Sequence, residues 1–193
     1  YDILLGTQVV AKGLDFPLVT LVGVINADTS LNLPDFRASE DTFSLLSQVA
    51  GRSGRSELNG EVIIQTYNPD NYAIVSASKH DYLAFYNREM AIRKMMKYPP
   101  YYYLCYIRVS GKDSLEVFNQ ANKIKQILDS RSHNLILGPT PCSIYKLNNV
   151  YRYGILIKYR KDDNLKLILN EVIEHYVGSK IKVDIDFNPR EIL

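Results

Sequence analysis

Strand-like and helix-like patterns follow one another in the order β-α-β-β-α-β over residues 101–187, and this order restricts the fold more than any other feature. Alternating or short apolar stretches predict four strands: Tyr101–Val109, Leu135–Leu137 (ending at Gly138-Pro139), Tyr153–Tyr159 and Lys180–Phe187. Apolar residues at helical spacing predict two helices between them: Leu115, Phe118, Ala121, Ile124, Leu128, and then Leu165, Ile168, Val172, Tyr176. This order is typical of the split βαβ or ferredoxin-like arrangement, so we expect an open antiparallel sheet with both helices on one face.

Residues 1–66 have a different pattern, because their apolar runs are continuous. The β-branched run Leu18–Ile25 predicts a strand covered on both faces, and Gly60–Thr66 predicts a second strand. Between them, Ser39 precedes an acidic first turn and apolar residues at helical spacing. We therefore expect a helix from about Ser39 to Ala50, ended by Gly51. Strands separated by a helix in this way predict a parallel α/β sheet.

A segment without strand signals, Asn68–Lys97, separates the two patterns. It ends at Tyr98-Pro99-Pro100, where two prolines should stop any helix. We therefore expect two domains, residues 1–97 with a helical connector and residues 98–193. Charge divides in the same way, since residues 1–80 hold 5 Lys and Arg against 9 Asp and Glu, and residues 81–193 hold 18 against 12. The two halves should have different electrostatic partners.

Composition excludes several classes of protein. With 46% hydrophobic residues among 193, the chain can bury a sizeable core, and its apolar runs are far shorter than the roughly 20 residues that cross a bilayer. Only Cys105 and Cys142 are present, too few for a disulfide framework or a four-ligand zinc site, which fits a reducing cytoplasm. Because the chain opens at Tyr1 without an initiator Met, we expect a piece of a longer polypeptide.

Metal-binding and serine-hydrolase patterns are weak. His80, His133 and His175 have no ligand spacing to one another or to either cysteine. Asp184 and Asp186 share one strand face without further acidic partners, and no G-x-S-x-G elbow occurs. We therefore expect no metal ligand and no serine nucleophile.

The most informative string is Gln48-Val49-Ala50-Gly51-Arg52-Ser53-Gly54-Arg55. Each arginine follows a glycine, which has no Cβ to hold an anion away, and a guanidinium binds phosphate oxygens bidentately. This pattern is typical of an arginine finger. Taken alone, the string fits a basic loop that makes ordinary ion pairs equally well.

A second string lies upstream, Gly6-Thr7-Gln8-Val9-Val10-Ala11-Lys12-Gly13-Leu14-Asp15-Phe16-Pro17, and leads into the strand Leu18–Ile25. Together the two strings resemble motifs V and VI of superfamily 2 helicases, and within that superfamily the PriA family of replication-restart helicases. The resemblance continues through Met95–Pro100, Leu137–Pro141, Tyr151–Tyr153, Asp184–Asp186 and Pro189, so it covers essentially the whole chain. Ser53 and Leu14 depart from the family pattern without changing the charge of the site.

The resemblance implies that residues 1–97 are the end of a RecA-like helicase lobe. Arg52 and Arg55 would then face the γ-phosphate of ATP, with Arg55 as the arginine finger, and Gln48 would couple the loop to the nucleotide. Such a finger typically contributes about 10³ to 10⁵ in rate. The remaining residues expected to contact or sense the nucleotide are Asp15, Gly51 and Gly54.

Three residues of the upstream string are expected to contact DNA. Thr7 and Gln8 lie where a predicted strand, Asp2–Leu5, gives way to a loop at the mouth of a parallel sheet, where such sheets bind ligands. The resemblance implies that Thr7 touches the DNA backbone and that Asp15 relays between nucleotide and DNA. Lys12 is expected to contact phosphate through its positive charge. The alternatives are a helix cap for Thr7, a solvated Lys12 and a turn-forming Asp15.

The chain has no G-x-x-x-x-G-K-[ST] phosphate loop and no Asp-Glu-x-His tetrad for Mg²⁺. In the resembled family, those elements lie on the first helicase lobe, and a zinc module also lies upstream. We therefore expect ATP and Mg to be bound mainly by that other lobe, and zinc only outside this chain. The isolated chain should neither hydrolyse ATP nor bind zinc.

The basic second half interleaves tyrosines with cations, at Tyr145-Lys146, Tyr151-Arg152-Tyr153 and Lys158-Tyr159-Arg160-Lys161. Aromatic rings stack on unpaired bases while cations follow phosphates, which suits forked or single-stranded DNA. The strongest DNA-binding candidates are Lys146, Arg152 and Arg160. Alternation places Tyr153, Ile155, Ile157 and Tyr159 on one face, so several tyrosines could instead belong to the core, with the lysines as a solvated surface.

The leading hypothesis is a fragment of an ATP-dependent DNA helicase that recognises stalled forks and restarts replication by primosome assembly. The resemblance further implies partners: primosome loading proteins, and the C-terminal tail of single-stranded DNA-binding protein, with Arg152 a candidate for its carboxylate. Another superfamily 2 translocase or repair helicase would share residues 1–66 but not the split βαβ unit. A non-catalytic nucleic-acid-binding docking module is the alternative from a different class.

Overall fold

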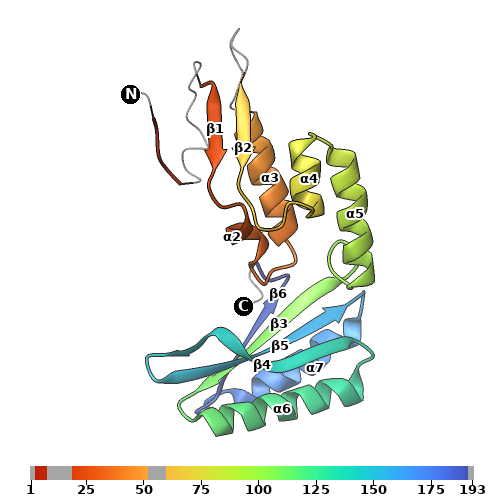
Figure 1. Ribbon diagram of the computed structural model, residues 1–193. Coiled ribbons are helices and arrows are strands. Elements are labelled where there is room, and N and C mark those ends of the chain that lie inside the picture. Colours follow the sequence, from red (N-terminus) through yellow and green to blue (C-terminus); the bar gives the residue numbers. More distant parts are fainter. Residues whose placement is uncertain (1–2, 8–18, 52–59, 191–193) are drawn as a thin grey trace. The chain divides into compact units, whose positions relative to one another are not determined.

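The computed structural model describes residues 3–7, 19–51 and 60–190 (Figure 1). The chain divides into two compact units, Tyr1–Ile92 and Arg93–Leu193. This division falls a few residues before the boundary expected near residue 98. Each unit has its own sheet and its own hydrophobic core.

The first unit holds a two-stranded sheet of β1 (Leu21–Val24) and β2 (Glu61–Ile64), with helices α2 (Asp28–Leu31), α3 (Ala38–Ala50), α4 (Tyr72–Ser78) and α5 (Tyr82–Met95). The two strands pair in parallel, as predicted, with Val22 opposite Val62 and Val24 opposite Ile64. Helix α5 ends at Met95, ahead of Tyr98-Pro99-Pro100, so the expected stop before the prolines is confirmed.

Burial of β1 differs from the prediction of a strand covered on both faces. Val22 and Val24 are half-buried, whereas Leu21 is 57% exposed, and β2 alternates in the same way. The reason is that the core contributed by α3, α4 and α5 packs against Val24 and Ile64 on one face of the pair. Residues 3–7 also form no strand, contrary to the expectation for Asp2–Leu5, and make no ladder in the described structure.

The start of α3 also differs from the prediction. Arg37, not Ser39, is the residue before the first helical turn, and it makes no side-chain cap. The segment that leads into α3 is held instead by Asp35, whose Oδ1 accepts a hydrogen bond from the Arg37 N–H at 2.8 Å. Inside the helix, the Thr42 hydroxyl donates to the Ala38 carbonyl at 2.7 Å.

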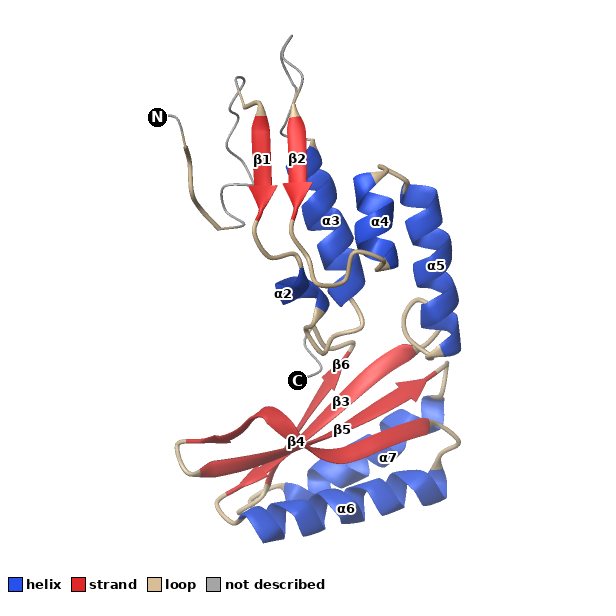
Figure 2. Ribbon diagram, in the orientation of Figure 1, coloured by secondary structure: helices blue, strands red, loops and turns tan. Residues whose placement is uncertain are grey.

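The second unit confirms the predicted β-α-β-β-α-β order. Its elements are β3 (Tyr103–Gly111), α6 (Ser114–Arg131), β4 (Leu135–Leu147), β5 (Val150–Tyr159), α7 (Asp163–Tyr176) and β6 (Lys182–Phe187). The four strands pair antiparallel in the order β4-β5-β3-β6, and Figure 2 shows both helices on the same face of the sheet. Asp113 and Asp162 cap α6 and α7 through their side chains.

Two details of the second unit correct the sequence prediction. Leu115 and Phe118 are exposed, because the buried stripe of α6 is Val117, Ala121, Ile124 and Leu128, which keeps the helical period towards the sheet. Strand β4 does not end at Gly138-Pro139 but continues to Leu147 with two register shifts. The first shift is accommodated at Gly138, whose φ of 101° lies in the region that glycine tolerates.

Candidate nucleic-acid interface

The β4–β5 hairpin extends beyond the rest of its sheet (Figure 1). The last pair between β5 and β3 is Tyr151 opposite Gly111, which is level with Lys146 opposite Tyr151, and the Leu147–Val150 pair and the turn lie beyond it. Its two-residue turn is Asn148-Asn149, with φ of 50° and 58°. Two positive φ values make a type I′ turn, which matches the twist of the strands and favours asparagine.

The rings of Tyr145, Tyr151 and Tyr153 pack together on the hairpin, and Tyr145 is hydrogen-bonded to Ser114 at the start of α6. The ring centroid of Tyr145 lies 5.4 Å from that of Tyr151 and 5.5 Å from that of Tyr153, both edge-on. The Tyr145 hydroxyl is 2.5 Å from the Ser114 hydroxyl and 3.3 Å from that of Tyr153. The hydrogen bond to Ser114 is the main cause that lowers the pKa of Tyr145. Of the tyrosines that the core alternative named, Tyr153 and Tyr159 do pack against the hydrophobic core, and Tyr145 and Tyr151 form ring contacts beside them.

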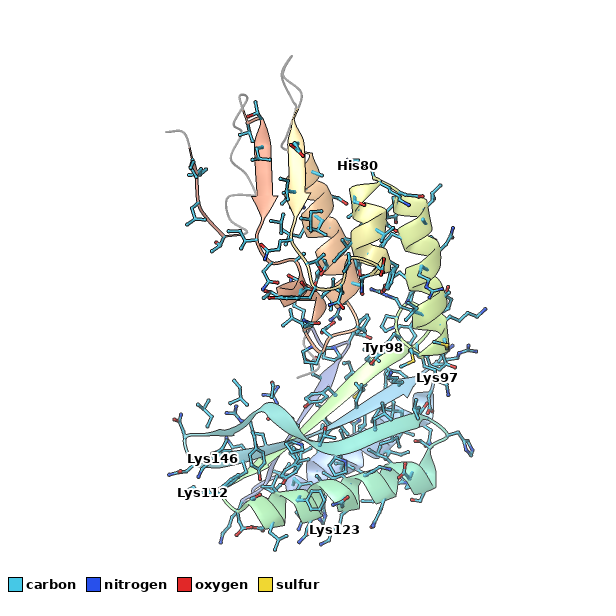
Figure 3. The ribbon with its side chains drawn as sticks, in the orientation of Figure 1. His80, Lys97, Tyr98, Lys112, Lys123 and Lys146 are labelled. Carbon is cyan, nitrogen blue, oxygen red and sulfur yellow. The ribbon has the colours of Figure 1, made fainter. Side chains whose placement is uncertain are left out.

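Lys146 lies on the hairpin beside this cluster (Figure 3). Its Nζ is 4.8 Å from the centroid of the Tyr151 ring, within the range of a cation–π contact. Because Lys146 is directly opposite Tyr151, both side chains project from the same face of the hairpin. The side chain is exposed and can reach a phosphate.

Arg152 projects from the opposite face, since successive residues of a strand alternate. It is half-buried and lies opposite Ser110 of β3. Arg160 follows the far end of β5, with its Cζ 4.8 Å from the centroid of the Tyr102 ring. At about 3.3 Å per residue, the backbones of Arg152 and Arg160 are about 26 Å apart. The three candidate cations of this half therefore occupy three separate places.

Lys158 was grouped with the DNA-facing cations from sequence, and the structure contradicts this. The residue is only 4% exposed, and its Nζ donates to the Met96 carbonyl at 2.9 Å and lies 3.3 Å from the Tyr98 ring centroid. Burial, and secondarily the charge of Lys97, lower the pKa of Lys158. Its ammonium ties the segment before β3 to the sheet and cannot reach a phosphate.

In the first unit, the structure describes three of the predicted site residues. Thr7 is exposed in a non-strand segment, Gln48 is exposed near the end of α3, and Gly51 ends that helix with its N–H donating to the Ser47 carbonyl at 3.1 Å. The others lie outside the described residues: Gln8, Lys12, Asp15, Arg52, Gly54 and Arg55.

Each of the two motif-bearing strings is followed in the sequence by a strand, and these two strands are neighbours in the sheet. Strand β1 follows the first string and β2 follows the second, and the Glu61 N–H donates to the Thr20 carbonyl at 2.8 Å. Since the strands are parallel, residues 19–20 and Gly60 lie at the same edge of the sheet. That edge is the amino edge of β1 and β2.

Asp28 organises the opposite, carboxyl edge and was missed by sequence reasoning. Its carboxylate accepts hydrogen bonds from the Thr66 hydroxyl at 3.0 Å, the Tyr67 N–H at 2.9 Å and the Asn68 amide at 2.9 Å. The bond from the Tyr67 N–H is the largest cause that lowers the pKa of Asp28. These bonds fasten the segment after β2 to the start of α2, beside a hollow of about 240 Å³.

The described part of the chain holds neither a metal-binding cluster nor a helix that could span a membrane. Within residues 3–7, 19–51 and 60–190, no three His, Cys, Asp or Glu side chains gather as a metal site would require. No helix of the described chain has the length and apolar character of a membrane span.

Comparison with known proteins relates the chain to replication restart. A family model described as the primosomal protein N C-terminal domain matches residues 94–190. "Replication restart protein PriA" of Bacillus subtilis is 48% identical over 97% of this chain, and the proteins of the same name from Chlamydia pneumoniae and Synechocystis are 40% and 41% identical over 97% and 99%. The chain covers 24%, 26% and 23% of these relatives, about a quarter of their length.

Proposed function

The chain belongs to the family of the primosomal protein N C-terminal domain, and from this premise we propose that it is the C-terminal part of an ATP-dependent DNA helicase. The whole protein would recognise stalled replication forks in the cytoplasm and restart replication by assembling a primosome. One observation carries this proposal: the similarity to the Bacillus relative extends over both units, not over the second unit alone.

The first unit supplies the catalytic part of the proposal. Arg55, with Arg52 and Gln48, would stabilise charge on the γ-phosphate of an ATP whose phosphates and Mg are bound mainly by another lobe. Asp15, Gly51 and Gly54 would complete this side of the nucleotide site. The adjacent starts of β1 and β2 support the proposal, because they bring the residues that follow each string, 19–20 and Gly60, to one edge of the sheet.

DNA contacts would come from both units. Thr7, Gln8 and Lys12 would contact the strand along which the motor moves, and Lys146, Arg152 and Arg160 would add phosphate contacts in the second unit. Their separation along β5 suits a branched substrate better than a single compact ligand. The single-stranded DNA-binding protein tail and the primosome loading proteins are further proposed partners.

The split βαβ unit favours replication restart over another superfamily 2 translocase. A translocase of a different family would share the parallel strand pair but would not require the second unit, to which the family model is specific. A non-catalytic docking module would bind DNA without consuming ATP.

ATP hydrolysis and strand separation by the full-length protein test the proposal. Forked DNA should stimulate hydrolysis far more than linear duplex DNA, and a fork with an unreplicated arm should be unwound. Hydrolysis that forked DNA does not stimulate would contradict a fork-recognising motor. DNA binding without any hydrolysis would favour the docking module.

A further inference from the structure

Strand β6 is a free edge of the four-stranded sheet. In the order β4-β5-β3-β6, it pairs with β3 on one side and with no described strand on the other. The Asn188 N–H donates to the Leu104 carbonyl, so the even-numbered residues of this strand direct their backbone groups towards β3. The N–H and C=O groups of Val183 and Ile185 therefore point outward, where a further strand can pair with them.

The opposite edge of the sheet, β4, is less suited to pairing. It contains Pro139 and Pro141, which have no N–H to donate, and its ladder with β5 has two register shifts. Strand β6 contains no proline, and its ladder with β3 is regular. An additional strand would therefore join the sheet at β6.

The sequence of the β6 edge is complementary to itself when two copies run antiparallel. Residues 180–186 read Lys-Ile-Lys-Val-Asp-Ile-Asp, with two lysines before Val183 and two aspartates after it. A two-fold axis at Val183 would place each lysine opposite an aspartate of the second copy, and each isoleucine opposite an isoleucine. The opposed residues would be Lys180 and Asp186, Ile181 and Ile185, and Lys182 and Asp184.

The charged side chains of this edge are available for such contacts. They are exposed, and within residues 3–7, 19–51 and 60–190 they form no ion pair: Lys180, Lys182, Asp184 and Asp186. Charges on an edge strand usually discourage pairing with another chain. The order of signs on β6 has the opposite effect, because the positive half of one copy meets the negative half of the other.

Helix α7 exposes apolar residues on the same side of the unit. It packs on β6, and its Glu171 faces α6, where it is hydrogen-bonded to Arg131. Ile173 lies about 200° further round the helix, so it points away from α6 and past the β6 edge. Ile173 is 40% exposed, and Val177, one turn later, is 76% exposed. In the two-fold arrangement, these residues of both copies would meet on the helix-covered face and leave water.

We propose that a second copy of this chain pairs antiparallel with β6, centred on Val183, so that the two four-stranded sheets join into one. The outward N–H and C=O groups of Val183 bond to those of the same residue in the second copy. The lysine–aspartate pairs fix the register, and Ile173 and Val177 add apolar contact. This surface is separate from the ATP and DNA contacts of the proposed function and goes beyond it.

Sedimentation equilibrium of chain 1–193 and of the full-length protein tests the proposal. Both should show a concentration-dependent dimer between about 5 and 200 μM, the weak association expected of a small interface. Asp184→Lys with Asp186→Lys makes the edge wholly basic, and Lys180→Asp with Lys182→Asp makes it wholly acidic. Each double variant alone should associate at least about tenfold more weakly, because every charge pair becomes repulsive. An equal mixture of the two variants should recover the dimer.

Two further variants control this experiment. Lys123→Asp with Lys146→Asp changes the same charge at exposed positions on α6 and the β4–β5 hairpin, and should leave the dimer intact. Val183→Pro keeps the test valid if the basic variant does not fold. It removes the outward N–H without removing a bond to β3, and should also give a monomer.

Three results would overturn the proposal. The first is an unaltered chain that stays monomeric at about 200 μM, above the range expected for a weak specific dimer. The second is a dimer that the β6 variants leave intact. The third is a dimer of chain 1–193 with a monomeric full-length protein, which would assign the edge to another part of the polypeptide. The proposed function is tested separately, because none of these results measures ATP hydrolysis or DNA binding.

Discussion

The side chain of Tyr106 occupies the space above Gly154, so that a Cβ built on Gly154 would lie 1.9 Å from the Tyr106 hydroxyl oxygen. The two residues lie on the neighbouring strands β3 and β5, and the Tyr106 hydroxyl continues to the Cys142 Sγ at 3.3 Å. The absence of a side chain at Gly154 is therefore what allows the ring to lie across the sheet.

Gly154→Ala should lower the free energy of unfolding of the second unit by about 1–3 kcal/mol, the usual cost of overpacking. The measurement is urea unfolding of chain 1–193. In a Tyr106→Ala background, the same substitution should cost much less, because the ring no longer fills the space. Gly23→Ala is the control, since a Cβ there meets nothing within 4 Å. Equal costs in both backgrounds would contradict the packing account.

The buried Cys105 thiol predicts a loss of stability at alkaline pH. Burial raises its pKa from 9.0 to about 12, and burial also raises the pKa values of Tyr106, Tyr159 and Tyr176. Above pH 9, the unfolded chain releases this proton while the folded chain retains it, so the free energy of unfolding should fall between pH 9 and 12. The lowered pKa of Lys158 acts in the opposite direction.

Cys105→Val isolates the contribution of the thiol. In thermal melts of this variant, the loss of stability that begins near pH 9 should be absent. Only the loss that begins near pH 10, where the tyrosines of the unfolded chain deprotonate, should remain. Cys142→Val is the matched control for the onset near pH 9, because Cys142 is only half-buried; it also removes the contact with the Tyr106 hydroxyl, so the comparison is restricted to that onset. The same alkaline profile in Cys105→Val as in the unaltered chain would contradict the assignment.

The contact between Lys158 and Tyr98 should show energetic coupling. Tyr98→Leu should destabilise the unaltered chain more than it destabilises a Lys158→Met variant, because only the charged side chain gains from the ring face. We expect a coupling energy of about 1–2 kcal/mol for a desolvated cation–π contact. Chemical unfolding of the four chains measures it, and a coupling near zero would mean that Tyr98 acts only as a hydrophobic contact.

Much of the second unit was predictable because its signals are local. Each strand and helix of this unit shows the apolar periodicity of its own type, close to two residues in strands and 3.6 in helices. The order in which these patterns follow one another is enough to predict the split βαβ arrangement. The error at Leu115 and Phe118 arose because α6 contains two overlapping apolar stripes, and only packing on the sheet selects the one containing Val117. Periodicity within a helix cannot make that choice.

The parts that sequence could not predict depend on contacts between distant residues. Lys158 and Arg160 look equivalent in sequence, but the segment containing Tyr98 covers only Lys158. Likewise, the neighbours of Arg152 are set by the register of three strands, which places Ser110 of β3 directly opposite Arg152, and Lys182 of β6 on the other side of Ser110. In the first unit, β1 has the apolar run of a fully buried strand, yet its described neighbours cover one face.

The separate locations of the three DNA-binding candidates predict independent effects. Arg152→Gln and Arg160→Gln change residues about 26 Å apart along β5, too far for shared partners. The free-energy changes for binding forked DNA should therefore add within about 0.3–0.5 kcal/mol in the double variant. Anisotropy titrations of the single and double variants measure this. A double variant no weaker than Arg152→Gln alone would show that Arg160 does not contact DNA.

The motor assignment depends most directly on Arg55, so the decisive measurement is the ATP hydrolysis rate of the full-length protein with forked DNA. Arg55→Ala should lower kcat by about 10³ to 10⁵ while the affinity for forked DNA stays the same. Arg88→Ala, which removes an exposed arginine from α5, should hydrolyse ATP at the normal rate. Normal turnover by Arg55→Ala would contradict the assignment of the glycine-flanked arginines to ATP hydrolysis.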